Sequence, residues 1–257
     1  MADWKPFPRA GHPAFDAERL KAHWPHLHRG DAEPWPDDPL VVQAWVLFHN
    51  GEFQRAAEAG LALGDAGLNV ASKATCIYAN HLEAREQLRQ DLLLQAAARA
   101  EAAQRRLPDL HGPWYWQAYA LGRYSQGISV AKALTQGLGT RIKQALETTI
   151  ERCPQHADAH LALATFHAEV IDKVGSMVGG MTYGANAAAG LALYERAMAL
   201  NPDSVVTLTE YANGLVMLKG PDALPEANSL LDRAASIEPL DAMERLYAAS
   251  ARVALES

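Results

Sequence analysis

Four stretches of the chain end in the same way, and this feature limits the possible folds more than any other. Each stretch has helical periodicity and ends at a proline, with small or apolar residues 12, 8 and 5 positions before it. The prolines are Pro108, Pro154, Pro202 and Pro239, which are 46, 48 and 37 residues apart. A helical pattern that recurs every few tens of residues is typical of arrays of stacked helical pairs. The sequence therefore predicts a repeat protein.

The rest of the chain agrees with an all-α fold. From about residue 40 onward, apolar residues recur at helical spacing, and no segment alternates with a period of two for more than a few residues. Hydrophobic residues make up 49% of the chain and charged residues 21%, which is enough apolar surface to build a core. The first 37 residues differ, because seven of the 14 prolines and three of the six tryptophans precede residue 40. We expect a proline-rich arm over 1–37, with one short helix at 15–24 that Pro25 ends.

Composition also excludes several classes of partner. The net charge of -7 repels phosphate backbones, so we expect no nucleic-acid partner. No apolar run has the length of a membrane span, and the first residues lack a secretory signal, so we expect no membrane insertion and a cytoplasmic location. The two cysteines, Cys76 and Cys153, are too few for a disulfide framework.

The residues before the four prolines resemble the second helix of the tetratricopeptide repeat (TPR), in which a small residue, a bulky residue and an alanine precede a proline. The first helices follow the same register: Leu121 and Gly122 match the Leu-Gly pair of the family, and Ala79, Ala164 and Ala212 fill the small position. A degenerate first unit at 38–64 carries Gly51, Phe53 and Ala56 at matching positions. The matching triplets in the second helices are Ala96, Ala100 and Ala103; Ile142, Leu146 and Thr149; Gly190, Tyr194 and Ala197; and Ala227, Leu231 and Ala234.

This resemblance implies a TPR-like helical-hairpin solenoid. We expect about five helical pairs over 38–239, a capping helix over 240–257, and about 11 to 13 helices altogether. In this register Gly122 lies where two helices pack closely, so a leucine there would overpack the contact.

The repeats are longer than the 34-residue consensus, and we expect the insertions to form loops or lengthened helices. One insertion is SQGISVAKALTQGLGT and the other is VIDKVGSMVGGMTYGANAA. Residues 118–163 also resemble, more weakly, the helical domain of the regulator-of-microtubule-dynamics family. That likeness implies a variant repeat rather than a microtubule function.

No motif predicts catalysis, a cofactor or a metal. His23, His26 and His28 have spacing that zinc could use, but they lack cysteine partners and a second ligand pair. The glycines at 175–184 are not followed by the lysine of a phosphate-binding loop. Cys153 has no triad partners, and no familiar hydrolase or protease signature occurs. We interpret a second group, His156, His160 and His167, as core histidines.

The TPR resemblance also predicts a binding surface, since four positions of each first helix line the concave face in that family. Arg123 is suited to a carboxylate, Asn80 and Asn213 to a peptide backbone, and Trp116 and Tyr119 to apolar contact. The clamp for acidic chaperone tails is absent, because Cys76 and Thr209 occupy its lysine position. The predicted groove residues are Lys73, Asn80, Trp116, Tyr119, Arg123, Asp158, Thr165, Thr209 and Asn213.

Two functions remain open at this stage. The first is a noncatalytic TPR-type adaptor that binds a protein segment in its concave groove. The alternative is a helical small-ligand-binding protein or enzyme in which the Gly-rich insertion 174–187 forms a lid carrying Met177, Met181 and Tyr183. In either case Trp24 and Trp35 of the arm could lie over Trp116 and Tyr119 and make that stripe part of the core.

Overall fold

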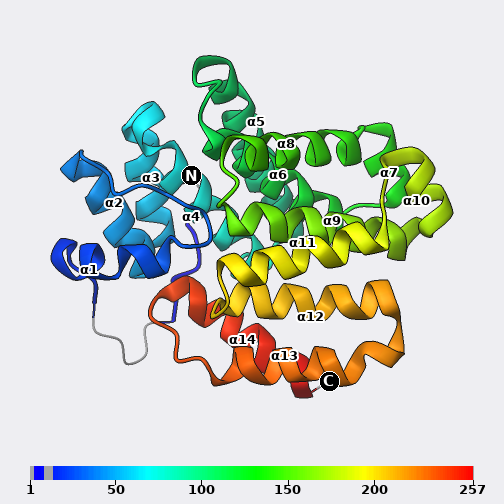
Figure 1. Cartoon of the computed structure of the whole chain (residues 1–257). Coiled ribbons are helices and arrows are strands. Elements are labelled where there is room, and N and C mark those ends of the chain that lie inside the picture. Colours follow the sequence, from blue (N-terminus) through cyan, green and yellow to red (C-terminus); the bar gives the residue numbers. More distant parts are fainter. Residues whose placement is uncertain (1–2, 9–13, 257) are drawn as a thin grey trace. The chain divides into compact units, whose positions relative to one another are not determined.

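The computed structural model describes residues 3–8 and 14–256, and within these ranges the chain is all-α, with no strand (Figure 1). The α-helices are α1 (Ala17–Leu27), α2 (Pro39–His49), α3 (Phe53–Ala62), α4 (Leu68–His81), α5 (Glu86–Arg106), α6 (His111–Gln126), α7 (Val130–Thr135), α8 (Leu138–Arg152), α9 (Ala157–Val174), α10 (Ser176–Tyr183), α11 (Ala187–Leu200), α12 (Val205–Lys219), α13 (Leu224–Ser236) and α14 (Ala242–Glu256). Two 3-10 helices are η1 (Gly64–Gly67) and η2 (Pro221–Ala223). The all-α prediction is confirmed.

The chain divides into two compact units, which we call unit 1 and unit 2. Unit 1 contains residues 33–148, the described residues up to His28, and Asp241–Met243. Unit 2 contains Arg29–Ala32, Thr149–Leu240 and the chain from Glu244 onward. The boundaries that the sequence suggests at residues 37 and 239 stay predictions.

The repeat register accounts for the core of both units. All twelve residues of the four triplets are buried, and Ala96, Ala100 and Ala103 have no exposed surface. The small residues of the first helices, Ala79, Ala164 and Ala212, are buried as well. A methyl group at these positions lets the backbones of two helices approach, which is why small residues recur there.

Side-chain caps fix several helix starts. The side chains of Asp16, Asp38, Asn186 and Ser204 accept hydrogen bonds from the first turns of α1, α2, α11 and α12. Such caps satisfy N–H groups that have no partner inside the helix. Pro39 at the first position of α2 has no N–H to satisfy, so it begins the helix rather than ending it.

Three sequence-based expectations need correction. The insertions contain short helices of their own, α7 and α10, so the described residues hold 14 α-helices rather than 11 to 13. Helix α1 continues through Pro25 to Leu27, because a proline near a helix end removes a single hydrogen bond and the helix ends two residues later. Gly122 does not lie at a close helix contact, since an added Cβ would meet nothing within 4 Å. The first side-chain carbon of a substituted residue at Gly122 would therefore meet no neighbouring helix.

Trp24 and Trp35 of the arm form a cluster with Trp45 of α2. The Trp24 ring stacks on His28 at 3.8 Å and meets the edges of Trp35 at 5.0 Å and Trp45 at 5.7 Å. The indole N–H of Trp24 donates to the carbonyl of Glu33. This aromatic cluster gives the arm its place in unit 1, and its rings meet on α2 rather than on the Trp116–Tyr119 stripe of α6.

Candidate functional site

In unit 1 the predicted groove residues lie on α4 and α6, and burial separates them into two groups. Lys73 is 3% exposed and its ammonium group lies 5.7 Å from the Trp45 ring and 5.4 Å from the Phe48 ring. Trp116 is 4% exposed, with its ring 5.7 Å from that of Tyr119. Lys73 and Trp116 therefore contribute to packing and offer a partner little surface.

Tyr119 and Arg123 form the accessible end of the stripe on α6. Both are half-buried, and the Arg123 guanidinium lies 5.4 Å from the Tyr119 ring centre. Arg123 also donates to Gln126 Oε1 at 3.3 Å. The ring holds the cation in place through a cation–π contact while part of its surface stays in water. This arrangement suits recognition of a carboxylate by a planar donor group.

A second arginine, Arg99 on α5, was missed by the sequence-based prediction. Its Nη2 donates to Thr75 Oγ1 at 3.3 Å, while its Nε is buried and has no hydrogen-bond partner among the described residues. Burial lowers the pKa of Arg99 below its ordinary value, and the nearby Cys76 opposes that shift. One signal existed in the sequence: Arg99 interrupts the alanine-rich face of its helix, three residues after Ala96.

The two arginines act on the same buried thiol. Burial raises the pKa of Cys76 to about 12, and the charges of Arg99 and Arg123 oppose that shift. Cys76 has no exposed surface. The thiol is thus neutral at pH 7 and supplies no negative charge to either cation.

Asn80 and His81 complete the region at the end of α4. The Asn80 amide donates to His81 Nε2 at 3.0 Å, and Asn80 itself is half-buried. Burial and then the Arg123 charge lower the pKa of His81 to about 4. The imidazole is neutral at pH 7, so Arg99 and Arg123 give this part of α4–α6 its positive charge.

In unit 2 the predicted groove residues mostly serve the fold. The Thr165 hydroxyl hydrogen-bonds the Tyr194 hydroxyl at 3.1 Å, and Thr209 is buried with its hydroxyl donating to Val205 O. The Asp158 carboxylate lies against Gly30, whose carbonyl accepts the Asp158 backbone N–H at 3.0 Å. Asn213 is exposed. Of these four residues, Asn213 offers the most accessible polar group.

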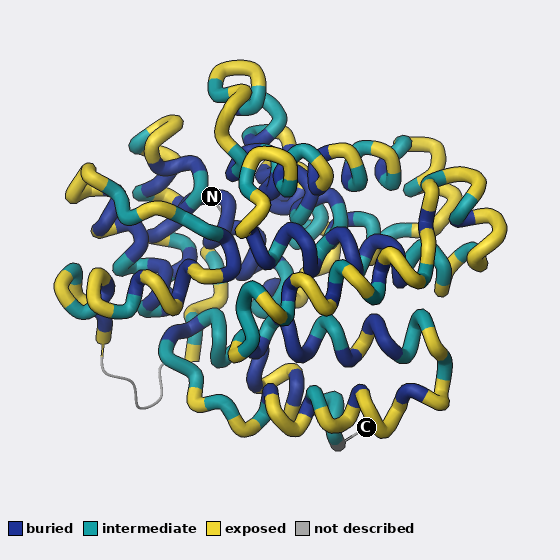
Figure 2. Tube along the Cα trace, viewed as in Figure 1, coloured by how far each residue is buried: buried dark blue, intermediate teal, exposed yellow. Residues whose placement is uncertain are grey.

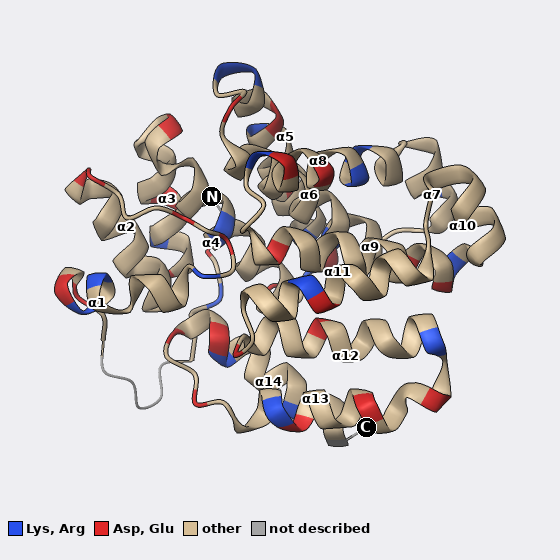
Figure 3. Cartoon of the chain, viewed as in Figure 1, with Lys and Arg blue, Asp and Glu red and all other residues tan. Residues whose placement is uncertain are grey.

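The Gly-rich insertion forms α10 and packs on α9 through small residues. Gly179 faces Val170, and the Tyr183 ring lies 6.2 Å from the Phe166 ring. Met177 and Met181 are 74% and 85% exposed, and α10 carries no charged residue (Figures 2 and 3). The residues proposed for a lid thus lie on a surface helix, with the two methionines in solvent.

A buried chain of polar groups in unit 1 includes one of the sequence-flagged histidines. His28 Nε2 lies 3.1 Å from His49 Nε2, and His49 Nδ1 lies 2.7 Å from an Asp241 carboxylate oxygen. The rings of Trp24 and Trp45 pack against His28. Among the described residues no group of three or more metal-ligating side chains converges. His28 is thus joined to distant parts of the chain through His49 and Asp241.

The second histidine group lies in the core, as the sequence predicts. His156, His160 and His167 are all buried. His156 caps α9 by accepting from the Ala159 N–H, His160 contacts the Pro154 carbonyl, and His167 accepts from the Asn186 N–H. Each ring satisfies backbone groups near a helix end.

Comparison with known proteins supports the fold. No protein-family profile matches the chain, and no curated protein matches it. Among solved structures, the chain resembles a thermophilic TPR protein from Thermus thermophilus, with a TM-score of 0.55 and 18% identity over 83% of this chain and 96% of that one. The TPR-like fold predicted from the sequence is confirmed. Among the described helices, none is long and apolar enough to cross a membrane.

Proposed function

We propose that this protein is a noncatalytic adaptor whose unit 1 binds an acidic protein segment on the α4–α6 surface. Arg99 and Arg123 bind the carboxylates, Tyr119 supplies the apolar contact, and Asn80 binds the backbone of the segment. This proposal keeps the accessible part of the predicted groove and adds Arg99. The TPR-like fold supports it, because stacked helical pairs create extended surfaces suited to peptide segments.

The observation that carries the proposal is the incompletely satisfied guanidinium of Arg99. A half-buried cation loses hydration, and it stabilises the fold only if an anion or several acceptors replace the water. Arg99 has one hydroxyl contact, and its buried Nε has no acceptor among the described residues. A carboxylate from a partner would pair with the accessible part of the Arg99 guanidinium, would replace its lost hydration, and would interact with the Arg123 charge as well.

The test is a selection of eight-residue peptides displayed on phage against the wild-type chain. We expect Asp and Glu to be enriched in the selected peptides. For one selected peptide, fluorescence anisotropy should show that Arg99→Gln and Arg123→Gln each weaken binding about tenfold, as expected for loss of a charge-assisted hydrogen bond.

Arg105→Gln is the matched control, because Arg105 is an exposed arginine on the same helix, α5. It should leave the affinity within about twofold, which is less than about 0.5 kcal/mol. Selected peptides without acidic residues, or equal losses from all three variants, would contradict the proposal.

A further inference from the structure

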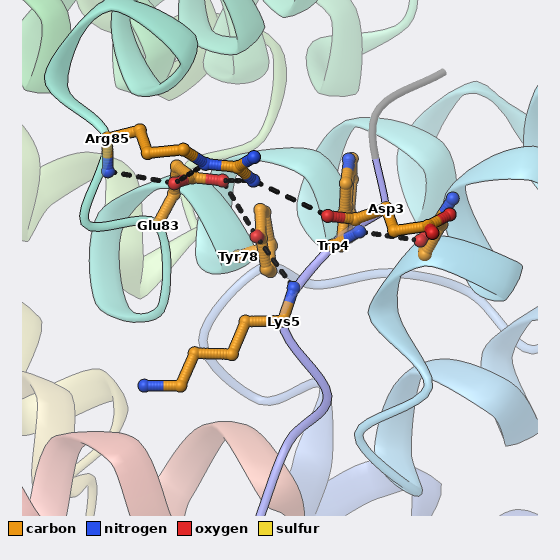
Figure 4. A network of polar contacts seen from close by, with 7 residues as sticks. Asp3, Trp4, Lys5, Tyr78, Glu83 and Arg85 are labelled. Atoms are coloured by element: carbon orange, nitrogen blue, oxygen red, sulfur yellow. Dashed lines mark hydrogen bonds and ion pairs between the residues drawn. The ribbon is translucent and has the colours of Figure 1, made fainter.

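The described start of the chain, residues 3–8, lies extended against α3 and α4 (Figure 4). The Trp4 ring stacks on the Tyr78 ring with centroids 4.2 Å apart and planes 11° apart. The backbone N–H of Trp4 donates to Gln54 Oε1 at 2.9 Å, and that of Lys5 donates to Tyr78 Oη at 2.9 Å. Two successive main-chain donors and one aromatic ring therefore hold this segment.

The acceptor on Tyr78 is fixed by a network that belongs to the helices. The Tyr78 hydroxyl donates to Glu83 Oε2 at 2.8 Å. The Arg85 guanidinium donates to both carboxylate oxygens of Glu83, from Nε to Oε1 at 2.8 Å and from Nη2 to Oε2 at 2.7 Å. The Arg85 hydrogen bonds hold the pKa of Glu83 at about 2, so the carboxylate stays charged. With its proton directed to Glu83, Tyr78 Oη presents a lone pair to the Lys5 N–H.

A second aromatic position lies three residues further along the segment. The Phe7 ring packs on Gly51, where an added Cβ would lie 2.5 Å from Phe7 Cδ1, and it meets the Phe53 ring edge-on at 6.0 Å. Gly51 also has φ of +78°, a backbone conformation that favours glycine. The turn before α3 thus forms a shallow seat for an aromatic ring.

The segment itself has the chemistry of a peptide ligand. Pro6 and Pro8 have no N–H and fix φ in the extended range, so little conformational entropy is lost when the segment binds. The Lys5 side chain extends away from Tyr78 and is exposed, while Trp4 and Phe7 are half-buried (Figure 4). Main-chain hydrogen bonds combined with seats for alternate side chains are a common way to recognise extended peptides.

We propose that the surface formed by Gly51, Phe53, Gln54 and the Tyr78–Glu83–Arg85 network is a peptide-binding site that the chain occupies with its own residues 3–8. The partner it fits carries an extended Trp-x-Pro-Phe segment in another protein, which binds by displacing the chain's own segment. This site uses different residues from the Arg99–Arg123 surface, so it stands independently of the function proposed above.

The experiment uses a labelled, capped peptide, Asp-Trp-Lys-Pro-Phe-Pro, and the full-length chain. In the double variant Trp4→Ala/Phe7→Ala the chain's own segment loses both anchors and the site is freed. Fluorescence anisotropy should show that the peptide binds this variant at least tenfold more tightly than it binds the wild-type chain. A peptide with alanine in place of its tryptophan should bind the variant at least tenfold more weakly than the parent peptide.

Substitutions in the site distinguish specific recognition of the peptide from nonspecific binding. In the freed chain, Tyr78→Phe keeps the stacked ring but removes the acceptor for Lys5, and it should weaken binding about fivefold. Arg55→Ala is the matched control: Arg55 is an exposed arginine of α3 beside Gln54 that pairs with Glu52, and its loss should leave the affinity unchanged. Arg99→Gln should also leave it unchanged.

Equal binding of the peptide to the wild-type chain and the folded double variant would overturn the proposal, as would no binding to either. If the double variant does not fold, Trp4→Ala alone, which keeps Phe7 on Gly51, is measured in the same way. Light scattering provides a further check. If the wild-type chain is dimeric and the double variant is monomeric, the site binds the segment of a second copy of this chain, and the proposal that another protein is the partner is wrong.

Discussion

In unit 2 the buried hydroxyl of Tyr194 is hydrogen-bonded inside the repeat core, whereas in unit 1 the half-buried cation of Arg99 is satisfied only in part by the described residues. Tyr194 has no exposed surface, hydrogen-bonds Thr165, and stacks on Tyr211 at 4.8 Å with an angle of 11° between the rings. Arg99 in unit 1 donates to one hydroxyl and keeps a buried Nε without an acceptor.

If the proposed function holds, the same repeat register serves packing at Tyr194 in unit 2 and binding at Arg99 in unit 1. Where a core polar group is paired inside the chain, as at Tyr194, substitution affects stability. Where a half-buried cation is satisfied only in part, as at Arg99, the proposed acidic ligand would complete its pairing. The predictions below test this division between packing in unit 2 and binding in unit 1.

The largest effect is expected at Gly214, which lies against the Tyr194 ring. A Cβ at this position would lie within 2.3 Å of Tyr194 Cζ, and the ring cannot move aside because it is held by Thr165 and Tyr211. Gly214→Val should therefore lower the free energy of unfolding by about 3 kcal/mol, as overpacking of a core does. Urea denaturation followed by circular dichroism measures the change.

Hydrogen exchange shows where that damage falls. Amides of α11 and α12 should lose protection, while amides of α4 and α6 keep theirs, if the packing role belongs to unit 2. Gly180→Ala is the control within unit 2, because its Cβ would meet one carbonyl oxygen at an ordinary 3.5 Å. Equal losses of protection in both units would break the comparison.

A smaller effect is expected on the titration of His81 in unit 1. Burial and the Arg123 charge together lower its pKa to about 4, so Arg123→Gln should raise that pKa but leave it below 6.5, since burial remains. Arg123→Lys keeps the charge and is the control. The His160 ring of unit 2, whose pKa is lowered by burial first and which lies near Arg196, should not respond. NMR titration of the ring protons distinguishes the two histidines.

The lowered pKa of His81 also predicts how the stability of the chain depends on pH. In the unfolded chain His81 binds its proton near pH 6.5, whereas in the folded chain it does so near pH 4. The unfolded state therefore takes up the proton first, and the contribution of this group to stability falls as the pH drops from 6.5 to 4. Arg123→Gln should narrow that window. An unchanged acid dependence would show that the Arg123 charge does not reach His81.

The repeat register could be predicted from the sequence because it rests on local spacing. Buried triplets such as Ala96, Ala100 and Ala103 follow from helix periodicity and from the proline that ends each repeat. The helices of the insertions could not be predicted in this way, since α7 and α10 are too short to show a clear period.

The candidate site was predicted in part. Tyr119 and Arg123 followed from register positions, but the burial of Lys73 depends on Trp45 and Phe48, which come from another helix. The contact of Arg99 with Thr75 joins residues 24 apart in the chain, and that of Trp4 with Tyr78 spans a still longer separation. Contacts of this kind depend on tertiary packing, which one sequence without a structure does not specify.

The smallest effect is expected at Gly122, where the family register and the structure disagree. An added Cβ there meets nothing within 4 Å, and the residue lies inside α6 without a positive φ. Gly122→Ala should therefore stabilise the chain by about 0.5–1 kcal/mol, because alanine loses less backbone entropy in a helix. Residues i and i+1 of a helix do not face each other, so the same variant should leave Arg123 in place and bind the selected acidic peptide with unchanged affinity. Destabilisation by more than about 1 kcal/mol would show that Gly122 does lie at the close helix contact that the TPR register predicts. In that case small residues would serve packing in unit 1 as they do in unit 2.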